Sequence, residues 1–150
     1  MANPSKAKGT RAESLAVRYL QAHGFPTARR QPLAGAKDQG DIIACELPRV
    51  LCEVKSRTRP VSSQQIETWC RETDDEAVNA NADLAVLIVH QSGRNVADWD
   101  TWMPIGDWSF LWHTVAYPSA VGEPWLMAPL RVWAPLVSAW VDAVHQVGES

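Results

Sequence analysis

The chain has 150 residues, of which 46% are hydrophobic and 21% charged, a composition typical of one soluble globular domain. Its net charge of −3 conceals an asymmetry, because residues 1–60 carry a net charge of +6 and the remainder −9. No segment reaches the roughly 18 uninterrupted apolar residues of a membrane span. The first charged residues are not followed by the apolar run of a secretory signal. We therefore expect a cytoplasmic protein without membrane contact.

The first expected element is a helix that follows a basic arm. Residues 1–9 have the composition of a flexible arm, and from Thr10 apolar side chains recur at helical spacing until a stop at His23-Gly24. Glu13 lies at the edge of the apolar stripe. It either reaches inward to a site or is an ordinary first-turn glutamate that the helix dipole favours.

A β-hairpin is expected between Gly40 and Lys55. One strand begins at Asp41, a proline-containing break follows Cys45, and a second strand runs to Lys55. Because side chains alternate along a strand, Glu53 and Lys55 share a face, and strand pairing brings Asp41 close to Glu53. Two close carboxylates raise each other's pKa unless a cation lies between them, and hard oxygen ligands favour Mg²⁺ or Mn²⁺. Taken alone, the pattern fits a solvated strand edge equally well.

The next elements are a helix and a buried strand. Ser62 and Gln65 match a capping box at the start of a helix that closes near Asn81. Gln64 and Gln65 either support a site on the preceding strand or are plain helix-start residues. The continuous apolar run of residues 84–89 predicts a central strand buried on both faces, and a further strand near residues 99–103 and a short helix near 107–112 complete the domain.

The three cysteines lack the spacing of metal ligands. Two fall in expected strands and one on the apolar face of the second helix, so we expect reduced core thiols and no zinc site. These residues are Cys45, Cys52 and Cys70.

Residues 113–150 form a tryptophan-rich extension with a helix expected near residues 129–146. The polar face of this helix lacks the lysines and arginines of a membrane-surface helix. We therefore expect it to pack on the domain or on a second subunit, with dimerisation favoured. The eight tryptophans offer stacking surfaces for bases, although core and interface positions are the commoner use of this residue.

Basic side chains are concentrated in the half of the chain that contains the hairpin. Such asymmetry indicates a nucleic-acid-binding face, because phosphate contacts supply most of the sequence-independent affinity. Each basic residue alone is consistent with simple solvation, but together with the carboxylates they suggest a track for phosphates. The candidate DNA contacts are Lys6, Lys8, Arg11, Arg29, Arg30, Lys37, Arg57 and Arg59.

The Asp41…Glu53-Val54-Lys55 pattern resembles the signature of the PD-(D/E)xK nuclease superfamily, with Gly40 where a proline is usual. The order of elements, from a helix with an early Glu13 to the segment ending near Trp102, is similar to that of Holliday junction resolvase-like nucleases of actinobacterial phages. The resemblance covers roughly residues 9–112. A related bacterial family of small nuclease-like proteins shares the helix, the Gly-acidic-Ile strand and the Glu-Val-Lys-x-Arg ending.

This resemblance implies an α/β fold with a restriction-endonuclease-like core over residues 10–112, in which helices flank a central mixed sheet of four to five strands. It implies that Glu13, Asp41, Glu53 and Lys55 are catalytic. It also implies that Mg²⁺, or Mn²⁺ in its place, is held by Asp41, Glu53, the Val54 backbone carbonyl and, through water, Glu13.

The function implied is a structure-selective DNA endonuclease that resolves four-way (Holliday) junctions or other branched DNA in the cytoplasm of a bacterial or phage-infected cell. Because a four-way junction has two-fold symmetry, such an enzyme is expected to be a homodimer. Flaps, single strands and linear duplex are alternative substrates. A non-catalytic DNA-binding or assembly protein on a nuclease fold is the alternative class.

Overall fold

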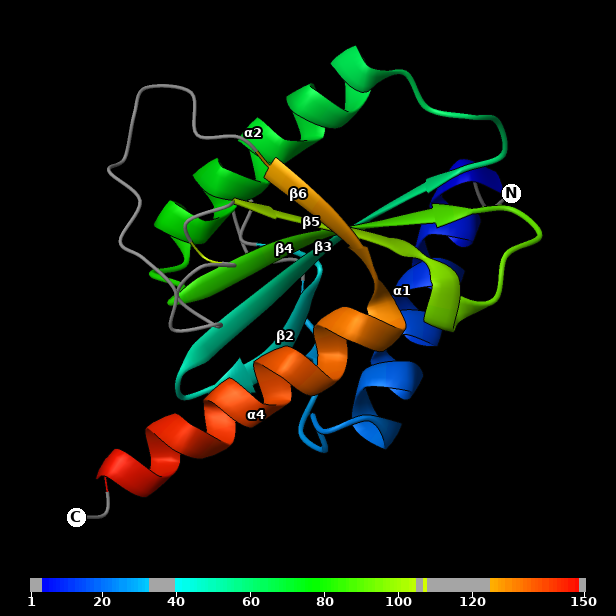
Figure 1. Ribbon diagram of the computed structural model, residues 1–150. Helices are drawn as coiled ribbons and strands as arrows, with labels where there is room; N and C mark the ends of the chain where they lie inside the picture. The colour runs from blue at the N-terminus through cyan, green and yellow to red at the C-terminus, as the bar shows by residue number, and fades with distance from the viewer. Residues whose placement is uncertain (1–3, 33–39, 105–106, 108–124, 149–150) are drawn as a thin grey trace.

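The computed structural model describes residues 4–32, 40–104, 107 and 125–148, without the side chains of residues 4–8. Its described part is a six-stranded mixed sheet with α2 on one face and α1 and α4 on the other (Figure 1). The elements are α1 (Pro4–Ala22), β1 (Arg29–Arg30), β2 (Ile42–Glu46), β3 (Arg49–Arg57), α2 (Ser63–Asn79), β4 (Leu84–Gln91), the 3-10 helix η1 (Val96–Asp98), β5 (Asp100–Pro104), β6 (Trp125–Pro129) and α4 (Leu130–Gly148).

The strands lie in the sheet in the order in which they occur along the chain. β3 and β4 pair in parallel, whereas the other neighbouring strands pair antiparallel. A parallel pair needs a long crossover, and α2 provides it. The expected α/β fold with a mixed sheet is confirmed. The expected count of four to five strands is wrong, because β6 extends the sheet beyond β5.

Alternate side chains of β3 face two different cores. Val50, Cys52 and Val54 belong to the core under α1 and α4, whereas Leu51 packs with the residues under α2. Glu53 and Lys55 follow Leu51 at strand spacing and therefore face α2. This alternation places a carboxylate and an ammonium between a strand and a helix.

Helix α1 begins at Pro4 instead of at the expected Thr10, so residues 4–9 of the expected flexible arm are helical. Proline has no backbone N–H group, and it fits the first turn of a helix because an N–H group there would have no partner within the helix. The helix ends at Ala22, next to the expected stop. Gly24 has a φ of +101°, and a Cβ there would come within 2.2 Å of Ser138 Oγ on α4.

Helix α4 packs on the domain. Trp133 and Val137 are fully buried, and the Trp133 ring stacks on Phe25 with a centroid distance of 5.8 Å. Strand β6 and helix α4 thus place residues 125–148 of the expected extension in the sheet and in the main core. Within the described residues, no helix has the length and apolarity needed to cross a membrane.

The second helix and its following strand agree with the sequence pattern. The Ser62 side chain accepts a hydrogen bond from the Gln65 N–H group at 3.2 Å, which caps α2. Residues 84–89 of β4 are all buried. The expected helix near residues 107–112 lies, apart from Asp107, outside the described residues.

Candidate active site

The β2–β3 hairpin brings Asp41 beside Glu53. Ile42 pairs with Cys52, so the residue before β2 lies next to Glu53 on β3. The Asp41 N–H group donates to the Cys52 carbonyl at 3.2 Å, and the Val54 N–H group donates to Asp41 Oδ2 at 2.8 Å. These two hydrogen bonds fix the Asp41 carboxylate against the edge of β3.

Glu53 is buried, with 5% of its surface exposed. Its Oε1 accepts from Lys55 Nζ at 2.7 Å, whereas its Oε2 is buried and meets no hydrogen-bond donor among the described residues. Burial, followed by the charge of Glu76, raises the pKa of Glu53 to about 8, and Lys55 opposes this only in part. An ionised Glu53 is therefore costly unless further positive charge is present.

The Asp41 carboxyl is perturbed in the same direction. Burial and the neighbouring Glu53 raise the pKa of Asp41 to about 7, although the hydrogen bond from Val54 lowers it and the charge of Glu13 adds a smaller increase. Asp41 and Glu53 are thus two adjacent carboxyls that both resist ionisation. Pairs of this kind are concentrated at functional sites.

Lys55 lies between two carboxylates. Its Nζ is 2.7 Å from Glu53 Oε1 and 3.2 Å from Glu72 Oε2 on α2. Burial alone would lower the pKa of Lys55, but Glu53 and Glu72 outweigh burial and raise it. The side chain therefore stays an ammonium ion at neutral pH.

Two glutamates of α2, Glu72 and Glu76, lie close to Lys55 and Glu53 and were not predicted from the sequence. Glu76 is buried, lies beside Glu53, and has its Oε2 3.9 Å from the point at which a Cβ would stand on Gly40. The sequence did contain a signal, because Glu76 occupies the stripe of α2 that also carries Trp69 and Thr73. A carboxylate at a core-facing position of a helix indicates a buried polar partner.

Glu13 is held by an arginine. Arg30 donates from Nε to Glu13 Oε2 at 2.7 Å and pairs with it again at 2.6 Å. Glu13 is close enough to Asp41 for its charge to raise the pKa of that carboxyl. The structure thus places Glu13 near the candidate site, with Arg30 as its direct partner.

The two candidate glutamines contribute to the start of α2. The Gln65 N–H group bonds Ser62, and the Gln64 carbonyl accepts from Thr68 at 3.0 Å. No described contact joins either side chain to Asp41, Glu53 or Lys55. Their support of the site remains a prediction.

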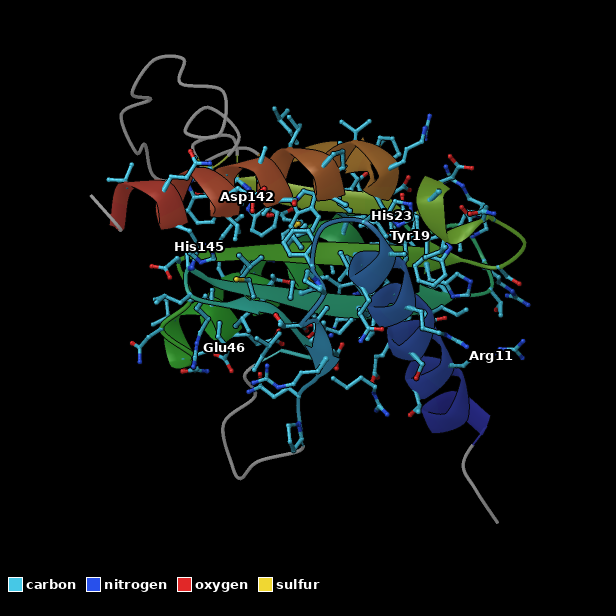
Figure 2. All side chains as sticks on the ribbon, turned by 90° about the horizontal axis from the view of Figure 1, so that it is seen from below. Arg11, Tyr19, His23, Glu46, Asp142 and His145 are labelled. Atoms are coloured by element: carbon cyan, nitrogen blue, oxygen red, sulfur yellow. The ribbon has the colours of Figure 1, made fainter. Side chains whose placement is uncertain are left out.

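The candidate DNA contacts lie on several elements. Arg29 pairs with Glu46, and the Arg57 guanidinium lies 5.0 Å from the centre of the Trp69 ring. Arg11 and Arg59 are exposed, and Figure 2 shows Arg11 on α1, far from Glu46 near the hairpin turn. The side chains of Lys6 and Lys8, and all of Lys37, lie outside the described part.

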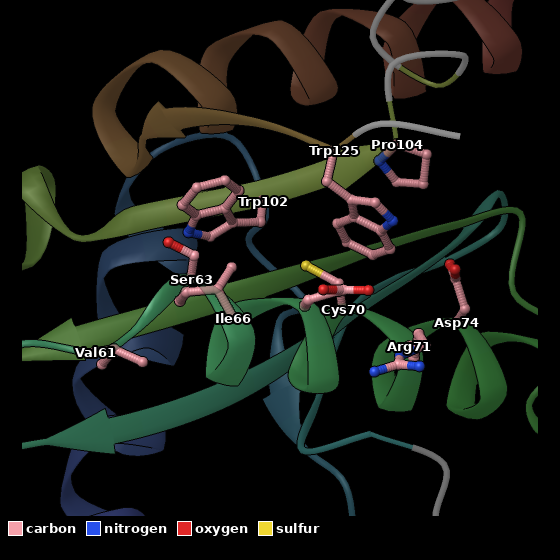
Figure 3. Close-up of a pocket in the computed structure, with 10 residues that line it drawn as sticks. Val61, Ser63, Ile66, Cys70, Arg71, Asp74, Trp102, Pro104 and Trp125 are labelled. Carbon is pink, nitrogen blue, oxygen red and sulfur yellow. The ribbon is translucent and has the colours of Figure 1, made fainter. Parts of the chain in front are cut away.

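A groove of about 800 Å³ lies on the other side of α2. Trp102 and Trp125 of the sheet face Ile66 and Cys70 of α2 across it (Figure 3). Asp41, Glu53 and Lys55 are absent from its lining. The groove is therefore separate from the carboxylate cluster.

The carboxylate pair fits a hard divalent cation in its donor chemistry. Within the described residues, no group of three or more His, Cys, Asp or Glu side chains is arranged to hold a metal ion. Asp41 and Glu53 nevertheless present adjacent oxygens, and the buried Glu53 Oε2 meets no hydrogen-bond donor among the described residues. Oxygen donors of this kind suit Mg²⁺ and Mn²⁺.

No protein-family model matches the chain, and no curated protein matches it. The chemistry of the site therefore rests on its own residues.

Proposed function

We propose that the protein is a Mg²⁺-dependent DNA endonuclease with a restriction-endonuclease-like core. One observation carries this proposal: Asp41 and Glu53 are adjacent carboxyls with raised pKa values, and Lys55 is bonded to Glu53 at 2.7 Å. A divalent cation would neutralise the two carboxylates and attract the anionic phosphate diester. Phosphodiester hydrolysis is accelerated by positive charge close to the attacking and leaving oxygens, which the cation and the Lys55 ammonium would supply.

The proposed roles differ between the groups that would hold the cation and the lysine. Asp41, Glu53 and the Val54 carbonyl would hold Mg²⁺, with Mn²⁺ as a substitute, and Glu13 would assist through a water molecule. When bound, the cation polarises the phosphate and lowers the pKa of a coordinated water. Lys55 orients the attacking water or neutralises the charge that develops on the phosphate, because its ammonium is held in place before substrate arrives.

Branched DNA is the proposed substrate, and a four-way junction is the preferred form. Support comes from the net charge of +6 on residues 1–60, the half that also contains the hairpin. Backbone contacts of this kind read the shape of DNA, not its bases. A homodimer would present two sites related by a two-fold axis, which matches the two-fold symmetry of a junction and would allow paired cuts.

The test is cleavage of labelled four-way, flap, single-stranded and linear DNAs in Mg²⁺, with the oligomeric mass measured in parallel. We expect cleavage of the branched substrates, its loss in Asp41→Asn, and its retention in Asp75→Asn, a control that removes a carboxylate from an exposed position of α2. Equal cutting of linear duplex would reject selectivity for junctions.

Calorimetric titration with Mn²⁺ separates an active site from a vestigial one on a DNA-binding or assembly protein. We expect Mn²⁺ to bind the wild type and to bind Glu53→Ala more weakly. Absence of binding, or equal binding by both proteins, would favour the non-catalytic alternative.

A further inference from the structure

Helix α2 and strand β3 present two pairs of charged residues in matching positions. Glu72 and Glu76 are four residues apart, which is about 6 Å along a helix, and Glu53 and Lys55 are two residues apart, about 6.6 Å along a strand. The crossover from β3 through α2 to the parallel strand β4 runs α2 back along β3. The earlier glutamate of α2 therefore meets the later residue of β3, and Glu76 meets Glu53.

The contacts follow this match. Lys55 Nζ lies 3.2 Å from Glu72 Oε2, and Glu76 lies beside Glu53. Lys55 thus has a carboxylate partner on its own strand and another on the neighbouring helix. Its side chain is 25% exposed, and its ammonium lies between these two elements.

A cation bound at the site would affect the two partners of Lys55, Glu53 and Glu72, differently. A cation bound by Glu53 would neutralise the negative charge that attracts Lys55 and would also repel the ammonium directly. The lysine stem has several rotatable bonds and would then be free to turn toward solvent. Glu72 is the partner that a cation on Asp41 and Glu53 would leave unchanged.

We propose, on the basis of the nuclease function above, that Glu72 is a positioning residue that holds the Lys55 ammonium in the site while Glu53 binds the cation. Glu72 touches neither the cation nor the phosphate in this role. It acts through Lys55 and fixes where the ammonium meets the substrate.

An ordinary surface ion pair is the alternative explanation, because the Glu72 side chain is 47% exposed. Exposed pairs of this kind contribute little to folding and nothing specific to catalysis. The two explanations differ in what a Glu72 variant changes. A surface pair affects stability alone, whereas a positioning residue affects the rate of the chemical step.

Cleavage under single-turnover conditions separates these explanations. Glu72→Ala should cut at least about tenfold more slowly than the wild type, since a misplaced catalytic group is costly, while its affinities for DNA and Mn²⁺ stay the same. Glu72→Gln should recover part of the rate because its amide oxygen still accepts from the ammonium. Asp75→Ala, a loss of one charge elsewhere on α2, should cut as the wild type does. A wild-type rate in Glu72→Ala would overturn the proposal.

A second measurement does not depend on nuclease activity. The chain has four lysines, Lys6, Lys8, Lys37 and Lys55, so limited acetylation followed by mass spectrometry reports on Lys55 against three references. Glu53→Gln removes the charge of Glu53 as a cation would. We expect Lys55 to be acetylated several-fold faster in the double variant Glu53→Gln/Glu72→Ala than in Glu53→Gln alone.

Equal acetylation in those two proteins would overturn the role of Glu72 whether or not the wild type cuts DNA. Faster acetylation in the double variant, combined with a wild type that cuts no DNA, would instead reject the nuclease function and retain the contact. The two measurements therefore distinguish failure of the nuclease function from failure of the role proposed for Glu72.

Discussion

Replacing Glu53 by glutamine tests the energetic basis of the candidate site. Glu53 has 5% of its surface exposed, and burial together with Glu76 raises its pKa from 4.5 to about 8. Because the folded-state pKa lies above the unfolded one, the folded protein binds this proton more tightly. The resulting stabilisation is complete below about pH 4.5 and is lost as the pH rises through about 8.

The expected magnitude follows from that difference. At about 1.4 kcal/mol per pH unit, Glu53 removes up to about 4 kcal/mol from the free energy of unfolding between pH 5 and pH 8. Glutamine stays neutral across this range and keeps an oxygen that accepts from Lys55. Glu53→Gln should therefore lose much less stability with rising pH and should be more stable than the wild type at about pH 8.

Urea denaturation in a chelator, at pH values from about 5 to 8, measures this difference. Asp75→Asn serves as the control, since it removes a carboxylate from an exposed position of the same domain. Adding Mn²⁺ should restore the stability of the wild type most strongly at high pH, because bound carboxylates must be ionised. Parallel curves for the wild type and Glu53→Gln would refute this account of the buried carboxylate.

Three further outcomes are expected. Gly24→Ala should lower the free energy of unfolding by about 1–3 kcal/mol more than Gly93→Ala. Both glycines have a positive φ, but only a Cβ on Gly24 would clash, at 2.2 Å from Ser138 Oγ. Equal losses in urea titrations would contradict this. Trp133→Ala should lower the free energy of unfolding by about 3–5 kcal/mol, because Trp133 is fully buried. Val132 is 40% exposed, so Val132→Ala should lower it by less than about 1 kcal/mol. Similar values for the two variants would show that α4 adds little to the core. Fluorescence anisotropy should show tighter DNA binding by the wild type in Ca²⁺ than in a chelator, and an affinity that ignores Ca²⁺ would count against a cation between the carboxylates and the phosphate.

The sequence predicts the parts of this fold that depend on local pattern. The strand alternation of β3, the cap at Ser62 and the apolar run of β4 each follow from residues within a few positions of one another. The meeting of Asp41 with Glu53 also follows, because a hairpin has a short connection whose register is limited by its turn. Local chemistry was sufficient in each case.

The missed features depend on long-range packing. The run Trp125–Pro129 is apolar without alternation and directly precedes a helix, so nothing local distinguishes an edge strand from the start of that helix. The sequence likewise leaves open which surface α4 covers, and burial of Trp133 against Phe25 requires the folded chain. Glu72 and Glu76 were missed because a glutamate on a helix is usually solvated, and only the neighbouring strand gives it a partner.

The charges around Glu53 come both from the β2–β3 hairpin and from α2. Glu53 and Glu72 contact the Lys55 ammonium, and Asp41 and Glu76 lie close enough to Glu53 for their charges to interact with it, so carboxyl groups outnumber the ammonium here. Such an excess of acid would repel a phosphate and would also resist ionisation in a buried setting. A divalent cation relieves both effects, because it lowers the cost of the buried charges and turns the local field toward the phosphate. The features that make the buried carboxyls costly to ionise near neutral pH are therefore the same ones that would make cation binding and phosphate binding interdependent.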